Sequence, residues 1–161
     1  MAVEKTKESK KAKVEPKLEG NIVIVRIRGV IGVNENISRT LNQLKLFKKN
    51  FCAVIPNNKI NKGMVLKVKD YVTWGSIDDE TYKILVREKS EEYKDRLTDK
   101  KEKIKYNRFL EVDGKKIKKF FRLNSPKKGY GKKGIKIPFV KGGALGDRKE
   151  KINGLIKRMI Q

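Results

Sequence analysis

Residues 21–76 alternate between two kinds of hydrophobic pattern, and this alternation is what most constrains the fold. An apolar, β-branched run at 22–29 ends in a glycine, and similar runs follow at 51–55 and 71–75, so each predicts a buried strand. The two segments between these runs space their apolar residues three or four apart, which predicts helices. We therefore expect a core made of a strand, a helix, a strand, a helix and a strand.

Several residues of this core are open to two interpretations. The faces expected to pack are Ile37, Leu41, Leu44 and Phe47 in the first helix, after the cap-type residues Asn34 and Asn36, and Ile60, Met64 and Val68 in the second. Cys52 is interpreted as a small core residue rather than a nucleophile, because the chain has no histidine to activate it. Trp74 is interpreted as core packing, with a base-stacking platform as the alternative.

The chain is strongly basic. Its 161 residues include 42 Lys and Arg against 19 Asp and Glu, for a net charge of +23. Such a charge favours a polyanionic partner, and nucleic acid is the first candidate. A membrane is disfavoured because the sequence has no long apolar stretch, and residues 1–20 lack the apolar centre of a signal peptide, so we expect a cytoplasmic protein.

Composition also argues against catalysis. The absence of histidine removes the commonest metal ligand and general base, and a single cysteine excludes an internal disulfide. We expect neither a metal nor a cofactor. The only acidic cluster near the core, at 78–80, is interpreted as helix-start chemistry, with Ser76 as the cap and Asp79 three residues on.

The most informative segment runs from Lys115 to Gly146 and is called the basic arm below. It has no acidic residue in 32 positions, and it holds ten lysines and Arg122 among glycines, prolines and aromatic residues. A solvated loop normally mixes charge signs, so we interpret the arm as an RNA-binding element whose glycines allow close approach to phosphate. The glycines at 129–134 do not match a phosphate-binding nucleotide loop, because Ile135 stands where Ser or Thr is required.

Local patterns flank the arm. Residues 87–108 carry both charge signs and are interpreted as an exposed helix or linker, and Asp113-Gly114 predicts a two-residue hairpin turn with Leu110 opposite Ile117. A terminal helix is expected after an Asp147 cap with Glu150 in its first turn, and its apolar face is Ile152, Leu155, Ile156 and Met159. The expected organisation is a mixed-charge tail at 1–20 that orders only on RNA, a core at 21–90, and a connector, basic extension and helix at 91–161.

Three motifs follow one another along the chain: the run 24–29 with Gly32 and 39–44, then Gly63 and Met64 with 67–75, then 121–130 continued at 141–148 and 151–153. In residue type and spacing they resemble the thirtieth family of large-subunit ribosomal proteins, whose eukaryotic member is the seventh large-subunit protein. The short tail and the C-terminal extension resemble its archaeal members. The resemblance implies an α+β fold with a ferredoxin-like β-α-β-α-β core, a three-stranded sheet and a basic extension.

The resemblance also implies a function. It implies a structural constituent of the large ribosomal subunit in the cytoplasm, present in one copy, with rRNA and neighbouring ribosomal proteins as partners and no catalysis or small-molecule substrate. The RNA-facing positions that it implies are Arg28, Gly32, Arg39, Lys45, Lys48, Arg122, Lys127, Lys128, Tyr130 and Lys141. Charge alone adds Lys132, Lys133 and Lys136.

Two alternatives from other classes are kept. A free RNA-binding protein or RNA chaperone would use the same basic arm outside the ribosome. An RNA-cleaving enzyme would need a carboxylate site, for which only the cluster at 78–80 is a candidate.

Overall fold

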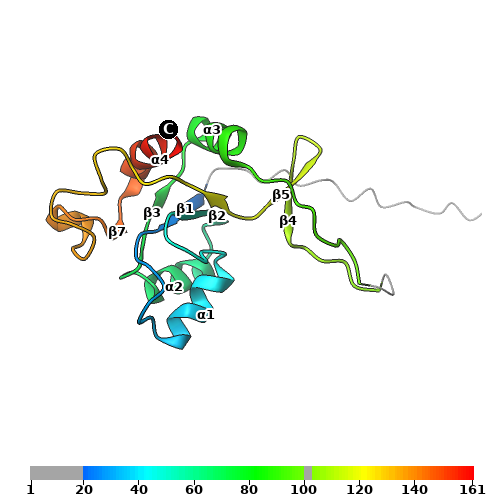
Figure 1. Ribbon diagram of the computed structural model, residues 1–161, viewed down its shortest axis with the longest axis horizontal. Coiled ribbons are helices and arrows are strands. Elements are labelled where there is room, and N and C mark those ends of the chain that lie inside the picture. Colours follow the sequence, from blue (N-terminus) through cyan, green and yellow to red (C-terminus); the bar gives the residue numbers. More distant parts are fainter. Residues whose placement is uncertain (1–19, 100–102) are drawn as a thin grey trace, which may run out of the picture.

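A five-stranded mixed sheet forms the centre of the protein (Figure 1). The structure is a computed structural model and describes residues 20–99 and 103–161, so residues 1–19 of the predicted tail lie outside it. The strands stand in the order β6-β2-β1-β3-β7 and are β1 (Asn21–Arg26), β2 (Phe51–Pro56), β3 (Val72–Ser76), β6 (Phe121–Arg122) and β7 (Gly146–Asp147). The three predicted strands are its central three. The two edge strands both come from the basic arm and its end, so the arm extends the sheet on both sides.

Helices cover both faces of this sheet, and the fold is α+β as predicted (Figure 1). They are α1 (Glu35–Gln43), α2 (Lys59–Lys67), α3 (Asp79–Lys89) and α4 (Ile152–Ile160). The first two lie on one face, and the last two lie side by side on the other. None of these four helices, in the described part of the chain, is long and apolar enough to cross a membrane.

Strand β1 is the centre of both apolar layers. Successive side chains of a strand point to opposite faces, so Ile22 and Ile24 pack with α1 and α2, whereas Val23, Val25 and Ile27 pack with α3 and α4. All five are buried. A strand buried on both faces has a continuous apolar sequence rather than an alternating one, which explains the run that identified it.

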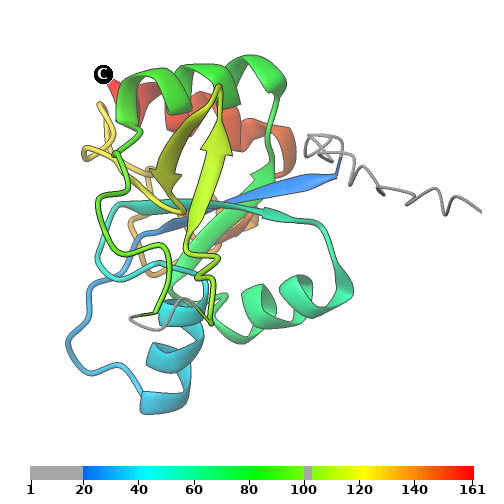
Figure 2. The same cartoon turned by 90° about the vertical axis from the view of Figure 1, so that its right-hand side faces the viewer.

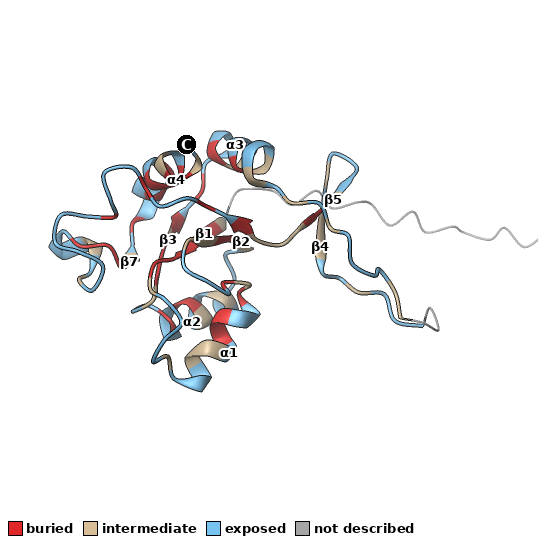
Figure 3. Cartoon of the chain, viewed as in Figure 1, coloured by how far each residue is buried: buried red, intermediate tan, exposed pale blue. Residues whose placement is uncertain are grey.

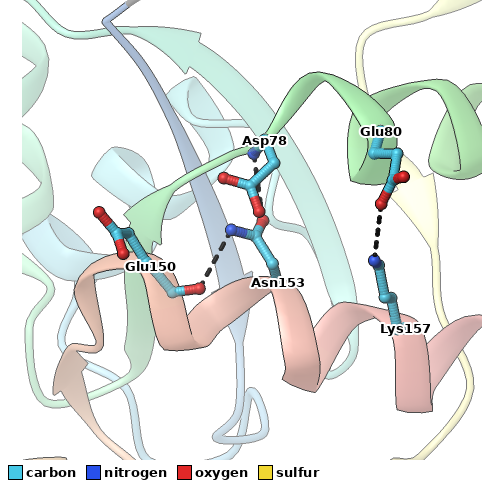
Figure 4. Close-up of polar contacts among 5 residues, drawn as sticks. All are labelled: Asp78, Glu80, Glu150, Asn153 and Lys157. Atoms are coloured by element: carbon cyan, nitrogen blue, oxygen red, sulfur yellow. Dashed lines mark hydrogen bonds and ion pairs between the residues drawn. The ribbon is translucent and has the colours of Figure 1, made fainter.

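Helix α4 buries the face that its sequence predicts. Ile152, Leu155, Ile156 and Met159 are at most 1% exposed, and each such side chain contributes about 1.5–3 kcal/mol when it is fully buried. Figure 4 shows how α4 is held against α3. The Asn153 side chain accepts a hydrogen bond from the backbone N–H of Asp78, and Lys157 forms an ion pair with Glu80 at 3.1 Å.

The two predicted helix caps are placed differently. Ser76 does not cap α3, because its backbone belongs to β3 and pairs with Ile22; the helix begins three residues later, after Asp78. Asp147 does not cap α4 either, because that helix begins only at Ile152 and its cap position is Lys151. The Asp147 Oδ1 instead accepts from the Lys149 N–H at 2.8 Å, at the start of a short 3-10 turn, η2 (Lys149–Lys151), which stands before α4.

The Asp113-Gly114 hairpin forms as predicted. It joins β4 (Phe109–Val112) to β5 (Lys115–Lys118), with Leu110 opposite Ile117. Both turn residues have positive φ, 50° and 74°, which matches the type I′ turn that suits a twisted hairpin. Figure 2 shows this two-stranded sheet beside α3, where Ile117 joins the apolar cluster.

Two predicted apolar faces are partly wrong. Helix α1 ends at Gln43, so Phe47 lies beyond it in the loop to β2 and is 39% exposed. In α2 the buried residue is Val65, whereas Ile60 in the first turn is 77% exposed. Figure 3 shows burial concentrated in the sheet and in the helix surfaces that face it. Neither side chain belongs to the buried apolar clusters on the sheet, although the sequence pattern includes both.

Candidate nucleic-acid interface

A buried arginine organises the two loops at one end of β1. Arg26 is 3% exposed, and its guanidinium donates to the carbonyls of Leu46 at 2.8 Å and Phe47 at 3.0 Å in the α1–β2 loop. It also donates to the carbonyls of Arg28 at 2.9 Å and Gly29 at 2.7 Å after β1. One side chain therefore fixes the backbone of both loops that carry the first group of predicted RNA-facing residues.

Burial lowers the pKa of Arg26, and the four carbonyl dipoles replace the water that its charge has lost. Sequence reasoning missed this residue as an organiser of the site. The signal was available, since Arg26 is a single charge inside the apolar run 22–27. A charge at such a position is either exposed or held by hydrogen bonds, and sequence alone does not name its acceptors.

Asn50 joins the α1–β2 loop to the basic arm. Its carbonyl accepts from the Leu123 N–H at 3.1 Å, and its side-chain amide donates to the Ser125 hydroxyl at 3.2 Å. Its Oδ1 accepts a hydrogen bond from the Tyr130 hydroxyl. Its positive φ of 66° turns the chain into β2 at this point. The loop that carries Lys45 and Lys48 is thereby joined to residues 123–130 of the arm.

Tyr130 lies inside the structure rather than on its surface. It is 9% exposed, and burial raises its pKa to about 12. Lys49 Nζ stands 5.9 Å from the centre of its ring. With the ring enclosed and the hydroxyl bonded to Asn50, this side chain holds the arm in position.

A second buried arginine organises the arm itself. Arg148 is 5% exposed and donates through Nη2 to the carbonyls of Tyr130 at 2.9 Å and Ala144 at 3.0 Å. Its Nε donates to the Thr73 hydroxyl of β3 at 3.0 Å, and its guanidinium lies 4.4 Å from the centre of the Phe139 ring. Burial, together with the charge of Arg158, lowers its pKa to about 10. The arm is thus wrapped around a cation that is tied to the central sheet.

Two glycines of the arm serve close packing of its own backbone. A Cβ added to Gly143 would lie 2.1 Å from the carbonyl oxygen of Ile137, and one added to Gly131 would lie 2.6 Å from the carbonyl oxygen of Gly143. At these two positions, segments of the arm's backbone lie too close together to leave room for a side chain. We expected these glycines to admit phosphate, and the structure instead uses them to fold the arm upon itself.

The lysines of the arm point away from this folded interior. The six predicted lysines beyond Arg122 are all exposed, and within the described residues none of them pairs with a carboxylate. They are Lys127, Lys128, Lys132, Lys133, Lys136 and Lys141. Between Pro138 and Gly142 the chain makes a short 3-10 turn, η1 (Phe139–Lys141). A surface with unpaired cations and no local acid attracts phosphate.

The other predicted residues are less uniform. Arg122 forms an ion pair with Glu91 at 2.8 Å, and Arg39 forms one with Glu35 at 2.6 Å. Arg28 is half-buried, donates to the Asp70 carbonyl at 3.2 Å and lies over the Tyr71 ring. Gly32 is exposed in the β1–α1 loop with a φ of 68°. Neither Gly32 nor Arg39 has a hydrogen bond to the arm in the described structure.

The acidic cluster at 78–80 has structural contacts. Glu80 pairs with Lys157, and the backbone of Asp78 is held by Asn153, as Figure 4 shows. Among residues 20–99 and 103–161, no three His, Cys, Asp or Glu side chains gather closely enough to hold a metal ion. Cys52 is fully buried in the core, where burial raises the pKa of its thiol.

Comparisons with known proteins agree with this geometry. The family model described as ribosomal protein L30p/L7e matches residues 22–72, which include Arg26 and Asn50. A protein of Nanoarchaeum equitans named large ribosomal subunit protein uL30 is 44% identical over 151 residues, covering 85% of this chain and 97% of that protein. Proteins of the same name from Methanosphaera stadtmanae and Methanopyrus kandleri are 40% and 37% identical, over 85% and 83% of this chain and 98% and 100% of their own lengths. At 83–85% of this chain, the similarity to these proteins covers far more residues than the family model matches.

Proposed function

This chain belongs to the ribosomal protein L30p/L7e family, and from this we propose that it is a structural constituent of the large ribosomal subunit that binds and stabilises folded rRNA. Its partners are large-subunit rRNA and neighbouring ribosomal proteins, and it works in the ribosome of the cytoplasm. It is present in one copy per ribosome, with no catalysis and no small-molecule substrate.

One observation carries the RNA-binding part of the proposal. Asn50 holds the α1–β2 loop against the basic arm through Leu123, Ser125 and Tyr130, so two basic segments far apart in sequence form a joined surface. Folded RNA presents closely spaced phosphates, and a protein that recognises it by shape needs cations at fixed mutual positions. Two buried arginines below these segments supply that rigidity.

The predicted residues take different roles in this proposal. The predicted cations contact phosphate and sugar: Arg28, Arg39, Lys45, Lys48, Arg122, Lys127, Lys128, Lys132, Lys133, Lys136 and Lys141. Gly32 lets the exposed loop after β1 lie close to the backbone of RNA. Tyr130 positions the arm from within. In domain terms, a ferredoxin-like core at 21–90 carries the RNA-binding extension at 91–161, and 1–20 is a mixed-charge tail.

The salt dependence of binding tests the role of the arm. If about six arm lysines contact phosphates, log K for large-subunit rRNA falls with log salt with a slope of about −4 to −5. Replacing Lys127 and Lys128 by Ala should weaken binding and flatten that slope by about 1–2 units, without changing which RNA is preferred.

A matched pair provides the control. Lys59→Ala with Lys67→Ala removes the same charge from exposed positions on α2, outside the basic arm. We expect the slope of this control to stay within about half a unit of the wild type. A slope that is unchanged in the Lys127/Lys128 variant, or flattened equally in both variants, would show that the arm is not the phosphate contact.

A further inference from the structure

Three phenylalanines from separate segments meet beside the Asn50 junction. Phe47 comes from the α1–β2 loop, Phe51 from β2 and Phe120 from the turn between β5 and β6. The rings of Phe51 and Phe120 stack at 5.2 Å between centroids, and Phe47 stands edge-on to both, at 6.1 Å and 5.6 Å. Together they form an aromatic cluster that partly faces solvent.

Phe47 is the exposed member of this cluster and is rigidly presented. It is 39% exposed, whereas Phe51 and Phe120 are half-buried behind it. Its own carbonyl accepts from the buried Arg26 guanidinium at 3.0 Å, and so does the preceding carbonyl of Leu46 at 2.8 Å. An exposed apolar ring on a fixed backbone is prepared for a contact that it does not make within the protein.

Several cations lie beside the cluster, and two of them, Lys45 and Lys119, have no ion-pair partner among the described residues. Lys119 is fixed by hydrogen bonds from its Nζ to the Asn107 carbonyl at 2.8 Å and to Oδ1 at 3.1 Å. Burial lowers its pKa, and the nearby charge of Lys45 lowers it further. Neither lysine forms an ion pair in the described chain. Because each positive charge disfavours the other, an anion bound beside both lysines would stabilise them.

Two other cations beside the cluster, Lys118 and Arg122, differ from Lys45 and Lys119 because they are paired with a carboxylate. Lys118 lies 5.8 Å from the centre of the Phe120 ring, and Arg122 lies 6.0 Å from that of Phe51. Both also pair with Glu91, at 2.9 Å and 2.8 Å. Their charge is therefore largely satisfied within the protein. Of these four cations, Lys45 and Lys119 are therefore the two that have no anionic partner in the described structure.

We propose that this aromatic cluster binds a single unpaired nucleotide of the rRNA, with its base against Phe47 and its phosphate between Lys45 and Lys119. The inference rests on the proposed function and specifies one of its contacts. Unpaired bases in folded RNA are the ones that stack on aromatic side chains, because bases within a helix are already stacked and paired. The arm lysines contact phosphate without regard to pairing, whereas this site requires a nucleotide outside a helix.

The test uses the full-length protein with large-subunit rRNA from the same organism. We compare Phe47→Leu, which keeps an apolar side chain without a ring, with Phe47→Tyr, which keeps the ring. We expect Phe47→Leu to raise Kd by about 5- to 100-fold, as loss of base stacking does, and to leave the salt slope unchanged because no charge is lost. Phe47→Tyr should stay within about 3-fold of the wild type.

Base-specific chemical probing of the bound RNA identifies the nucleotide directly. One or a few unpaired bases should be protected by the wild type and by Phe47→Tyr, and should become reactive with Phe47→Leu. Replacing both Lys45 and Lys119 by Ala should expose the same bases and flatten the salt slope by about 1–2 units. Leu66→Ala, which removes a 59% exposed apolar side chain from α2, serves as the control and should change neither readout.

The outcomes separate this inference from the proposed function. A wild type that binds rRNA with a steep salt slope while Phe47→Leu keeps the same Kd and protections overturns the nucleotide site alone. Loss of subunit assembly in Phe47→Leu with unchanged protections likewise overturns it, and assigns Phe47 to contact with a neighbouring protein. A wild type that shows no salt-dependent rRNA binding contradicts the proposed function itself.

Discussion

Replacing Arg148 by Met is the sharpest test of how the basic arm is attached. Methionine keeps the length and much of the apolar volume of the side chain but removes all donors. The carbonyls of Tyr130 and Ala144 and the hydroxyl of Thr73 then lose the charged donors that lie 2.9–3.0 Å away. The guanidinium contact with the Phe139 ring, at 4.4 Å, is lost as well.

The magnitude follows from these contacts. A hydrogen bond from a charged group contributes about 1.5–3 kcal/mol, and three of them give an upper range of about 5–9 kcal/mol. Removing the buried charge offsets part of this, because the cation no longer has to be desolvated. We therefore expect the free energy of unfolding to fall by about 3–5 kcal/mol, out of a total of about 5–15 kcal/mol for a domain of this kind.

Urea denaturation followed by the fluorescence of Trp74, the single tryptophan, measures this loss. With a slope of about 1–3 kcal/mol per molar urea, the midpoint should fall by about 2 M. Arg148→Lys should lose nearly as much as Arg148→Met, because one ammonium cannot reproduce the fork of donors. Arg87→Met, at a side chain 86% exposed, is the control and should stay within about 0.5 kcal/mol. A loss below about 1 kcal/mol in Arg148→Met, with the arm as resistant to trypsin as in the wild type, would refute the reasoning.

Two further predictions concern stability. Gly143→Ala places a Cβ 2.1 Å from the Ile137 carbonyl and should lower the urea midpoint and expose the arm to trypsin, whereas Gly154→Ala, in open space within α4, should stabilise by about 0.5–1 kcal/mol; equal effects would contradict the packing of the arm. Burial raises the pKa of the Cys52 thiol above its ordinary 9.0, so above pH 9 the unfolded chain holds fewer protons than the folded one. Stability should therefore fall as pH rises from 9 to 10, by up to about 1.4 kcal/mol per pH unit from this group, and urea midpoints of Cys52→Ala should fall less over that interval; equal pH slopes would contradict it.

The elements that sequence predicted well are those whose signal is local. The apolar run at 22–27 identifies a strand buried on both faces, and the Asp113-Gly114 turn fixes its hairpin register, because two residues with positive φ allow only a few geometries. The spacing of Ile152, Leu155, Ile156 and Met159 identifies the buried face of α4 in the same way. Each of these inferences depends only on residues within one strand, one hairpin or one helix.

What sequence could not show depends on contacts between distant segments. Arg26 and Arg148 are two cations among many, and several of their acceptors are distant in sequence: Leu46, Phe47 and Tyr130 lie 18–21 residues away, and Thr73 lies 75 residues away. Ile60 fits the same helical pattern as Met64 and Val68, yet it is 77% exposed and lies outside the apolar cluster that those two residues join. Ser76 is the last residue of β3 and pairs with Ile22, so it is not at the cap position of α3.

The residues of the candidate interface likewise fall into those that the sequence could name and those that required the fold. The exposed lysines of the arm could be named from sequence, three of them (Lys132, Lys133 and Lys136) on charge alone, because the segment 115–146 has no acidic residue. The positioning role of Tyr130 and the aromatic cluster around Phe47 required the fold, since Asn50 and Arg26 bring those segments together. Phe47 in particular was expected to face the core, and it became a candidate contact only when the helix was found to end before it.

Sedimentation of a cell lysate on a sucrose gradient, with and without a high-salt wash, tests the central claim most directly. We expect the protein to sediment with large ribosomal subunits and to remain there through moderate salt, as an integral rRNA-bound constituent does. Recovery at the top of the gradient, free or with small RNAs, would contradict the ribosomal function and favour an RNA-binding protein or RNA chaperone that acts outside the ribosome.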